Sequence, residues 1–349
     1  MSLKKSICIL LVLSLIFLFG GCAQKDVAPG ADGGTADAAR TFVMKIGTTV
    51  TDDSPGGLIL SNYFKPEIEK LSGGRVTVEI YNNSVLGGDR QLVESLQLGT
   101  LESCWSPLSV LSNFDAKFGA SDLPFVYKNP ETAYAALDGD WGALLAKDLP
   151  NQGIRLLAYG ENSFRNLSNN VRPIEKLEDM KGIKFRVMES PIYIATFTAL
   201  GANPTPIPFA ELYTALQNGT VDGQDNGTVL TYTNKLYEVQ KYYTISGQQY
   251  SASPILVSEN WWGGVPEDLQ KIIADAALEA CRRNREDNKK AETEYIKLIE
   301  ASGTKVNVLS DAEKERFREA CLPVWDNFVG EFGEDVIAAA HEINDKYGS

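Results

Sequence analysis

Residues 200–226 read LGANPTPIPFAELYTALQNGTVDGQDN, and their pattern alternates helical and extended segments. Gly201 ends a helix. Residues 203–208 carry proline at every second position; because proline cannot donate a hydrogen bond to a neighbouring strand, the segment is an extended edge or crossover and not a central strand. The pattern then predicts a helix over 209–218 and a short strand over 221–226 that leads into a loop.

The residues before this stretch alternate strands with helices in the same way. Ile183, Phe185 and Val187 mark a strand, and Ser190 precedes a helix over 191–200. Further upstream the pattern predicts strands over 42–47, 76–81 and 154–159 and another that begins near residue 101. Helices over 58–71 and 92–98 lie between the earlier strands, and Pro66 should kink the first of them. Such alternation favours mainly parallel sheets with helices on both faces.

The residues after this stretch contain one long helical pattern. Residues 266–301 have no internal glycine or proline, and a helix of that length is roughly 50 Å long at about 1.5 Å per residue, long enough to brace two domains. Residues 305–309 form a last strand. Ser310 and Glu313 have the spacing of a capping box before a C-terminal helix.

The N-terminus has the features of an export signal. Two lysines precede an apolar run over residues 6–19, which is shorter than the roughly 20 residues that span a bilayer. The segment LFGGC, which ends at Cys22, resembles the lipobox of bacterial lipoproteins, although Phe19 stands where leucine is more frequent. We therefore expect a lipoprotein signal peptide over 1–22, lipidation of Cys22 and, over the Ala-, Gly- and Asp-rich residues 23–41, a flexible tether.

Charge and composition exclude several classes of function. Removing Lys4 and Lys5 with the signal leaves 31 basic and 46 acidic residues, a charge of −15, which argues against nucleic-acid binding. His341 is the single histidine, and no glycine-rich nucleotide motif follows a strand, so we expect no metal, no cofactor and no histidine catalysis. Cys281 and Cys321 either form a disulfide or stay buried thiols. An exported hydrolase that uses two carboxylates remains an alternative.

Three stretches resemble one protein family. They are VLGGDR over 85–90 with its following helix, MKGIKFRV over 180–187, and residues 200–226. They are similar to the substrate-binding proteins of tripartite ATP-independent periplasmic (TRAP) transporters, the DctP family. The likeness runs from about residue 42 through the long helix and weakens after Lys305.

The resemblance implies an α/β, two-domain periplasmic-binding-protein fold with a long interdomain helix and a ligand cleft between the domains. We expect residues 42–162 with 252–292 in domain I and residues 163–251 with 293–349 in domain II. It further implies a solute receptor, not an enzyme, that lies outside the cytoplasmic membrane and delivers a small organic acid anion to TRAP membrane subunits.

The resemblance also predicts which residues contact the ligand. Arg186 would form the principal salt bridge to a ligand carboxylate, which suits a guanidinium with two parallel N–H donors. The other candidates are residues at matching positions or close to them: Arg165, Asn226, Phe209, Asp89, Thr49 and Gln248.

Several alternatives stay open at this point. Gly227 replaces a frequent proline and Gln248 lies near a frequent histidine, so the ligand could be a C4-dicarboxylate, a sugar acid, a 2-oxo acid or an aromatic acid. A binding component of another importer or of a sensor would share the same two-domain architecture. The sequence does not decide the oligomeric state or whether a metal ion binds with the ligand.

Overall fold

The computed structural model describes residues 40–348, so the predictions for residues 1–39, including Cys22, lie outside the described part. Within it, one mixed sheet has the strand order β2-β1-β3-β8-β4-β7-β5-β6, and β9 pairs with β8. The strands are β1 (Phe42–Thr48), β2 (Val76–Tyr81), β3 (Ser103–Trp105), β4 (Ile154–Asn169), β5 (Lys184–Val187), β6 (Asn203–Pro206), β7 (Gly223–Asn226), β8 (Tyr242–Ser258) and β9 (Lys305–Val308).

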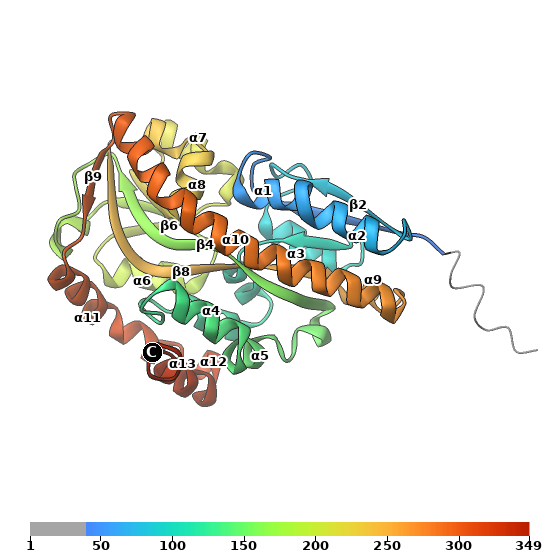
Figure 1. Ribbon diagram of the computed structural model, residues 1–349. Coiled ribbons are helices and arrows are strands. Elements are labelled where there is room, and N and C mark those ends of the chain that lie inside the picture. The colour runs from blue at the N-terminus through green and yellow to red at the C-terminus, as the bar shows by residue number, and fades with distance from the viewer. Residues whose placement is uncertain (1–39, 349) are drawn as a thin grey trace, which may run out of the picture. The chain divides into compact units, whose positions relative to one another are not determined.

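Helices cover the sheet and connect its strands (Figure 1). The α-helices are α1 (Pro55–Ile59), α2 (Lys65–Leu71), α3 (Asp89–Gln97), α4 (Pro130–Asp138), α5 (Asp140–Ala146), α6 (Pro191–Ala199), α7 (Leu212–Gln217), α8 (Thr228–Thr233), α9 (Glu259–Trp262), α10 (Glu267–Ala301), α11 (Asp311–Asn327), α12 (Val329–Phe332) and α13 (Glu334–Tyr347). A π-helical turn, η2 (Leu60–Phe64), and the 3₁₀ segments η3 (Leu108–Asn113), η4 (Ala116–Asp122), η5 (Leu149–Gln152), η6 (Leu177–Met180), η7 (Phe209–Glu211) and η8 (Leu236–Val239) complete the elements.

Two long antiparallel strands, β4 and β8, run through both halves of the sheet. On one side, β1 pairs in parallel with β2 and β3; on the other, β5 pairs in parallel with β6 and β7. The parallel pairing predicted from the alternation is therefore confirmed within each half. β8 and the second half of β4 are not predicted from the sequence, because nearly all of their residues are buried and many are small and polar, so neither segment has an apolar alternation.

The proline-rich segment forms an edge strand, as the sequence predicts. β6 is the last strand of the sheet, paired only with β5 among the described strands, so its prolines need no hydrogen-bonded neighbour on the outer side. The helix expected over 209–218 begins as the 3₁₀ turn η7 and continues as α7.

Pro66 does not kink a continuous α-helix as expected. The chain forms α1, widens into the π-helical turn η2 and resumes as α2, in which Pro66 occupies the first turn. The π-helical turn and α2 follow one another without a break, and the Lys65 N–H donates to the Leu60 carbonyl five residues earlier. The wider π-helical turn thus accommodates a proline that has no N–H of its own.

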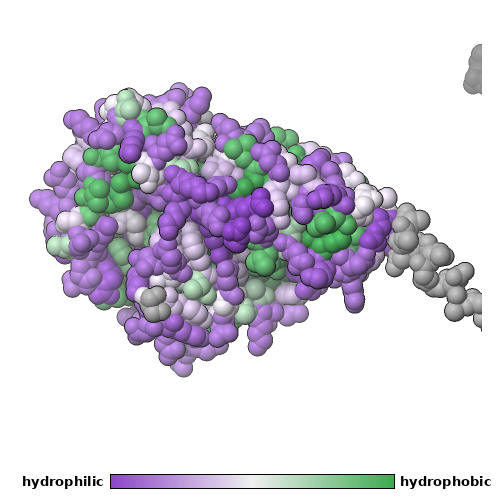
Figure 2. Space-filling model, viewed as in Figure 1, coloured by the Kyte–Doolittle hydropathy of each residue, from purple (hydrophilic) through white to green (hydrophobic). Residues whose placement is uncertain are grey.

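The long helix α10 is confirmed, with 35 residues preceded by Pro266. Its first part packs Leu269, Ile273 and Ala277 in a core with Met44 and Ile46 of β1. Further on it contacts β4, α8 and β9, so it lies along both halves of the sheet (Figure 1). Its outer surface is hydrophilic where it crosses the middle of the view (Figure 2).

The C-terminal region contains three helices where one was expected. Ser310 caps α11 by accepting a hydrogen bond from the Glu313 backbone N–H, as predicted. Gly333, with a φ of 96°, precedes α13. α11 contacts α6 in one half of the molecule, whereas α13 packs against α4 and α5 in the other.

The three cysteines of the described chain are free and buried. The alternative of a disulfide between Cys281 and Cys321 is therefore wrong. Among residues 40–348, no helix combines the length and apolar character that crossing a membrane requires.

Candidate functional site

A cavity lies between the two halves of the sheet, with about 300 Å³ of empty space, part of it open to solvent. We call it the cleft cavity. Six of the seven residues predicted to contact a ligand line it: Thr49, Asp89, Arg165, Arg186, Phe209 and Asn226. They come from six different elements or their ends, namely the loop after β1, the start of α3, β4, β5, the start of η7 and the end of β7. The fold thus brings together side chains up to 177 positions apart in the chain, from Thr49 to Asn226.

Arg186 is a buried cation that forms no ion pair with any of the described residues. It lies on β5 with 2% of its surface exposed, and its Nε donates to the Ile207 carbonyl at 2.8 Å. Among residues 40–348 its buried Nη1 has no hydrogen-bond partner. Burial, reinforced by Arg165, lowers the pKa of Arg186 to about 10, so the side chain is still cationic at neutral pH. A buried charge with unused donors favours an anionic ligand.

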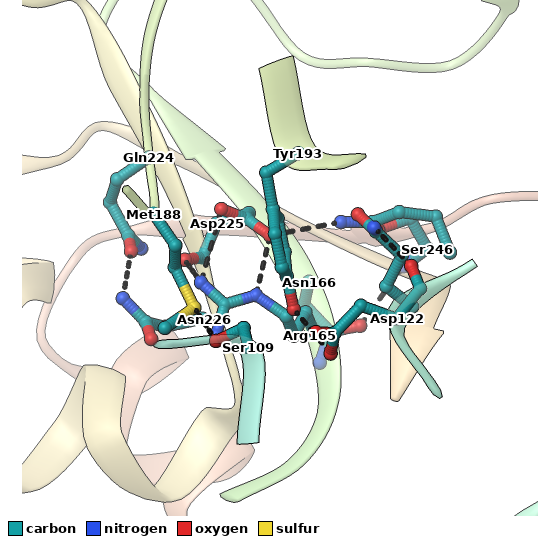
Figure 3. A network of polar contacts seen from close by, with 12 residues as sticks. Ser109, Asp122, Arg165, Asn166, Met188, Tyr193, Gln224, Asp225, Asn226 and Ser246 are labelled. Atoms are coloured by element: carbon teal, nitrogen blue, oxygen red, sulfur yellow. Dashed lines mark hydrogen bonds and ion pairs between the residues drawn. The ribbon is translucent and has the colours of Figure 1, made fainter. Parts of the chain in front are cut away.

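Arg165 differs because a carboxylate of the protein already neutralises it. Its Nε donates to Asp225 Oδ2 at 2.6 Å and its Nη2 to Asp225 Oδ1 at 3.1 Å (Figure 3). Its guanidinium carbon also lies 5.1 Å from the centre of the Tyr193 ring. Arg165 is therefore held in one orientation at the wall of the cavity, and Asp225, which the sequence analysis did not single out, holds it there.

Gln248 does not line the cleft cavity. Its Nε2 lies 3.5 Å from Asp225 Oδ2, and its Oε1 accepts a hydrogen bond from Ser246. It therefore reaches Arg165 only through Asp225. No periodicity could have indicated this, because β8 carries buried polar residues on both faces.

Asn226 and Phe209 complete the wall around Arg186. The Asn226 Nδ2 donates to Gln224 Oε1 at 2.6 Å, which fixes the amide and leaves its second N–H for another acceptor (Figure 3). The Phe209 ring centre lies 5.9 Å from the Arg186 guanidinium carbon, within the range of a cation–π contact.

Asp89 brings a negative charge to the same cavity from the opposite half. It is 8% exposed and accepts hydrogen bonds from Ser106 Oγ at 2.8 Å and Thr49 Oγ1 at 3.2 Å. Burial raises the pKa of Asp89 to about 6, although both hydroxyl groups act in the other direction. The cavity therefore offers a ligand the cation of Arg186 and, in Asp89, a buried hydrogen-bond acceptor, while the charge of Arg165 is already balanced by Asp225.

Contacts across the two halves close the cavity. Ser112 Oγ donates to Ser190 Oγ at 3.2 Å, and Asn113 Nδ2 donates to the Glu189 carbonyl at 2.9 Å. Five further residues line the cleft cavity and were not predicted from the sequence. Four are apolar and one, Asn162, lies on β4; they are Val50, Pro107, Asn162, Met188 and Leu230. Such positions have no sequence signal of their own, since only the closure of the two halves brings them together.

Comparison with known proteins gives consistent matches over most of the chain. The model of the family described as "Bacterial extracellular solute-binding protein, family 7" (DctP) matches residues 46–331. The C4-dicarboxylate-binding periplasmic protein DctP of Rhodobacter capsulatus is 33% identical over 306 residues, which are 86% of this chain and 90% of that protein.

Two solved structures with bound sugar acids are also similar. The sugar acid binding protein DctPAm of Advenella mimigardefordensis, in complex with galactonate, has a TM-score of 0.85 and 34% identity and covers 88% of this chain and 99% of its own. A TRAP periplasmic solute binding protein of Polaromonas, bound to D-erythronate, has a TM-score of 0.82 and 34% identity, with coverage of 86% and 98%. These two-domain neighbours match the fold described above.

Proposed function

This chain belongs to bacterial extracellular solute-binding protein family 7, and from that premise we propose that it holds a small organic acid by an ion pair between Arg186 and the acid's carboxylate. The family consists of solute receptors that serve TRAP transporters and not of enzymes, so the hydrolase alternative falls away. No covalent step is needed. Closure of the two halves over the acid would be the state that the membrane subunits recognise.

The observation that carries this proposal is the guanidinium of Arg186, which within residues 40–348 forms no ion pair and leaves Nη1 without an acceptor. A carboxylate can accept two parallel hydrogen bonds from a guanidinium, and the pairing neutralises a cation that the fold has removed from water. Exclusion of water strengthens the attraction further. Arg165 is already paired with Asp225, so it supports the site by orientation and leaves the principal ion pair to Arg186.

For the class of acid, we propose a monocarboxylate that carries hydroxyl groups, as a sugar acid does. Above its pKa of about 6, Asp89 is an anion that accepts hydrogen bonds from hydroxyl groups and repels a second carboxylate in the same cavity. The galactonate and D-erythronate complexes of similar proteins support this choice. The C4-dicarboxylate relative is the competing precedent.

Calorimetric titration of the ligand-free protein with D-erythronate, galactonate and succinate tests both steps. Arg186→Ala should weaken binding of the preferred acid by at least roughly 30-fold, because loss of one partner of a buried charged pair costs about 2–5 kcal/mol. The control Arg90→Ala removes an exposed arginine that is ion-paired with Glu94 on the helix that begins at Asp89, and should change little.

Two outcomes would contradict the proposal. Binding by Arg186→Ala within a few-fold of the wild type would exclude the ion pair. A preference for succinate over both sugar acids, unchanged in Asp89→Asn, would exclude the assignment of the acid class while leaving the role of Arg186 intact.

We also propose the two domains as expected from the sequence, with one change. The boundary at residues 162 and 163 is supported by the register shift between Glu161 and Phe164 on β4 and by the positive φ of Ser163. The packing of α13 against α4 and α5 favours placing this last helix with domain I, not with domain II.

For location, we propose export through the signal at residues 1–22 and a lipid anchor on Cys22, with residues 23–41 as tether. Cys22→Ser should move the protein from the membrane fraction to the soluble fraction of cells. Unchanged fractionation would exclude the anchor and leave the solute-binding proposal standing.

A further inference from the structure

A second and larger cavity lies on the other side of the crossing strands from the cleft cavity. It has about 990 Å³ of empty space, part of it open to solvent. We call it the hinge groove. Its floor is formed by Phe164 of β4 with Ser246 and Gly247 of β8, and its walls by Phe125, residues 127–130, one face of α11 and Asn344 of α13.

The hinge groove and the cleft cavity lie on opposite faces of strand β4. Phe164 lines the groove and the next residue, Arg165, lines the cleft cavity, as expected for neighbours on a strand whose side chains point to opposite faces. The pairing of β4 with β8 shifts register between Glu161 and Phe164 and again between Arg165 and Leu167. The two cavities therefore meet at the irregular part of the crossing strands.

The backbone beside the groove is strained at Phe125. Its φ is 60°, a conformation that is a genuine outlier for a bulky side chain, whereas the φ of 62° at nearby Gly247 is one that glycine adopts freely. The Phe125 N–H donates to the Gln248 carbonyl of β8 at 2.9 Å, which ties the loop to the crossing strand. Strain of this kind is retained where the surrounding structure fixes it, often at binding sites.

The lining of the groove combines aromatic rings with basic side chains. Phe125, Tyr127 and Phe164 supply the rings. On α11, Asp311, Lys314, Glu315 and Arg318 follow the helical spacing and face the groove together. Arg318 pairs with Glu315, its Nε lying 2.8 Å from Oε2, whereas Lys314 has no ion-pair partner among residues 40–348. With Lys128 included, three basic and two acidic residues line it, a net positive charge.

We propose that the hinge groove is a second binding site, for a small aromatic anion whose ring packs on Phe125 and Phe164 and whose charge pairs with Lys314. In the arrangement described, the groove is open while contacts between the halves close the cleft cavity. Because the groove and the cleft lie on opposite faces of the crossing strands, opening of the halves at the cleft is expected to narrow the groove. An occupant of the groove then binds the closed arrangement better and raises the affinity of the cleft for its acid. By linkage, the acid raises the affinity of the groove by the same factor.

The test uses 8-anilinonaphthalene-1-sulfonate, a fluorescent aromatic anion, titrated into the protein of residues 40–349. We expect saturable binding that Lys314→Glu weakens roughly tenfold, because a like charge replaces the opposite one beside the sulfonate. The matched control is Lys297→Glu, which reverses the charge of an exposed lysine on α10 outside the groove. Arg186→Ala, in the cleft, should leave binding of this probe unchanged.

Absence of saturable binding at millimolar probe, or equal affinity in Lys314→Glu and the wild type, would overturn the proposal. Loss of probe binding in Arg186→Ala would assign the probe to the cleft and overturn it too. Whichever sugar acid raises the melting temperature is then added at saturation, and tighter probe binding is expected. Unchanged probe binding would refute the coupling; a failure of every acid to bind would count against the proposed function and not against the groove.

Discussion

Asp225 forms a two-pronged ion pair with Arg165 in which both side chains are withdrawn from solvent, with 1% of Arg165 and none of Asp225 exposed. Arg186, in the same cavity, has no such partner among the described residues. The two arginines of the cavity therefore have different tasks. One is part of the wall, and the other is left for the ligand.

The first prediction concerns stability. Asp225→Asn should lower the free energy of unfolding by about 3–5 kcal/mol, because removal of one partner leaves Arg165 buried without a counter-ion. Urea denaturation measures this. The control Asp268→Asn breaks the exposed pair with Arg75 and should cost less than about 1 kcal/mol. The double variant Arg165→Met with Asp225→Asn should be more stable than Asp225→Asn alone; if it is not, the pair does not act as a unit.

The second prediction concerns the pH dependence of stability. Glu161 is 4% exposed and accepts hydrogen bonds from Tyr134 and Tyr250, with Arg285 and Glu292 nearby, and burial raises its pKa to about 7. The folded state then binds a proton that the unfolded state, with an ordinary carboxyl pKa, does not. Stability should therefore rise as the pH falls from above 7 towards the ordinary value of about 4.3.

Glu161→Gln keeps the amide oxygen as an acceptor for the tyrosines and removes the titration. Unfolding by urea at several pH values between 8 and 5 should show a smaller rise in stability for this variant than for the wild type. Parallel curves for the two proteins would mean that Glu161 is ionised throughout and that its burial is compensated in another way.

How far the sequence predicts this site depends on the residue. Arg186 was identified because a strand pattern and a family motif coincide at 183–187, and six of the seven predicted residues line one cavity. Gln248 lies behind Asp225, outside the cavity, and the sequence does not predict this. β8 is buried on both faces, so no apolar alternation indicates in which direction each of its side chains points. The roles of Asp225 and Phe164 depend on how two crossing strands shift register, which no local pattern encodes.

Elements of the fold likewise divide into those that local sequence predicts and those that long-range packing determines. Edge strand β6 and helix α10 follow from local chemistry, prolines in one case and an uninterrupted helical pattern in the other. The π-helical turn before Pro66 and the split of the C-terminal region into α11, α12 and α13 arise from packing between segments distant in sequence.

The third prediction concerns Gly227, which replaces the proline frequent in the family. Its φ of −60° would suit proline, but a Cβ atom at this position would lie 2.1 Å from the Asn162 carbonyl oxygen, so any side chain must push the loop away from β4. Gly227→Ala should weaken acid binding, because Asn226 and Asn162 both line the cleft cavity. Calorimetry with the preferred acid measures this, with Gly330→Ala, which meets no atom within 4 Å, as control. Wild-type affinity in Gly227→Ala would show that the close approach is absent from the bound state.

The last prediction concerns how α10 holds the crossing strand. Asn284 Oδ1 accepts a hydrogen bond from the Glu161 backbone N–H at 2.7 Å, and Asn288 Nδ2 donates to the Glu161 carbonyl at 3.1 Å. Two amides of one helix face thus hold the backbone of the last residue of β4 that is paired with β8 before the register shift. Asn284→Ala leaves a buried N–H without its partner and should cost about 1–3 kcal/mol of stability. Asn234→Ala, at a half-buried position on the surface loop after α8, is the control and should cost less.

Hydrogen exchange of the Glu161 amide gives a second measurement. Exchange of this amide should accelerate in Asn284→Ala far more than exchange of the amides of β1. Equal acceleration throughout would mean that the variant only lowers global stability.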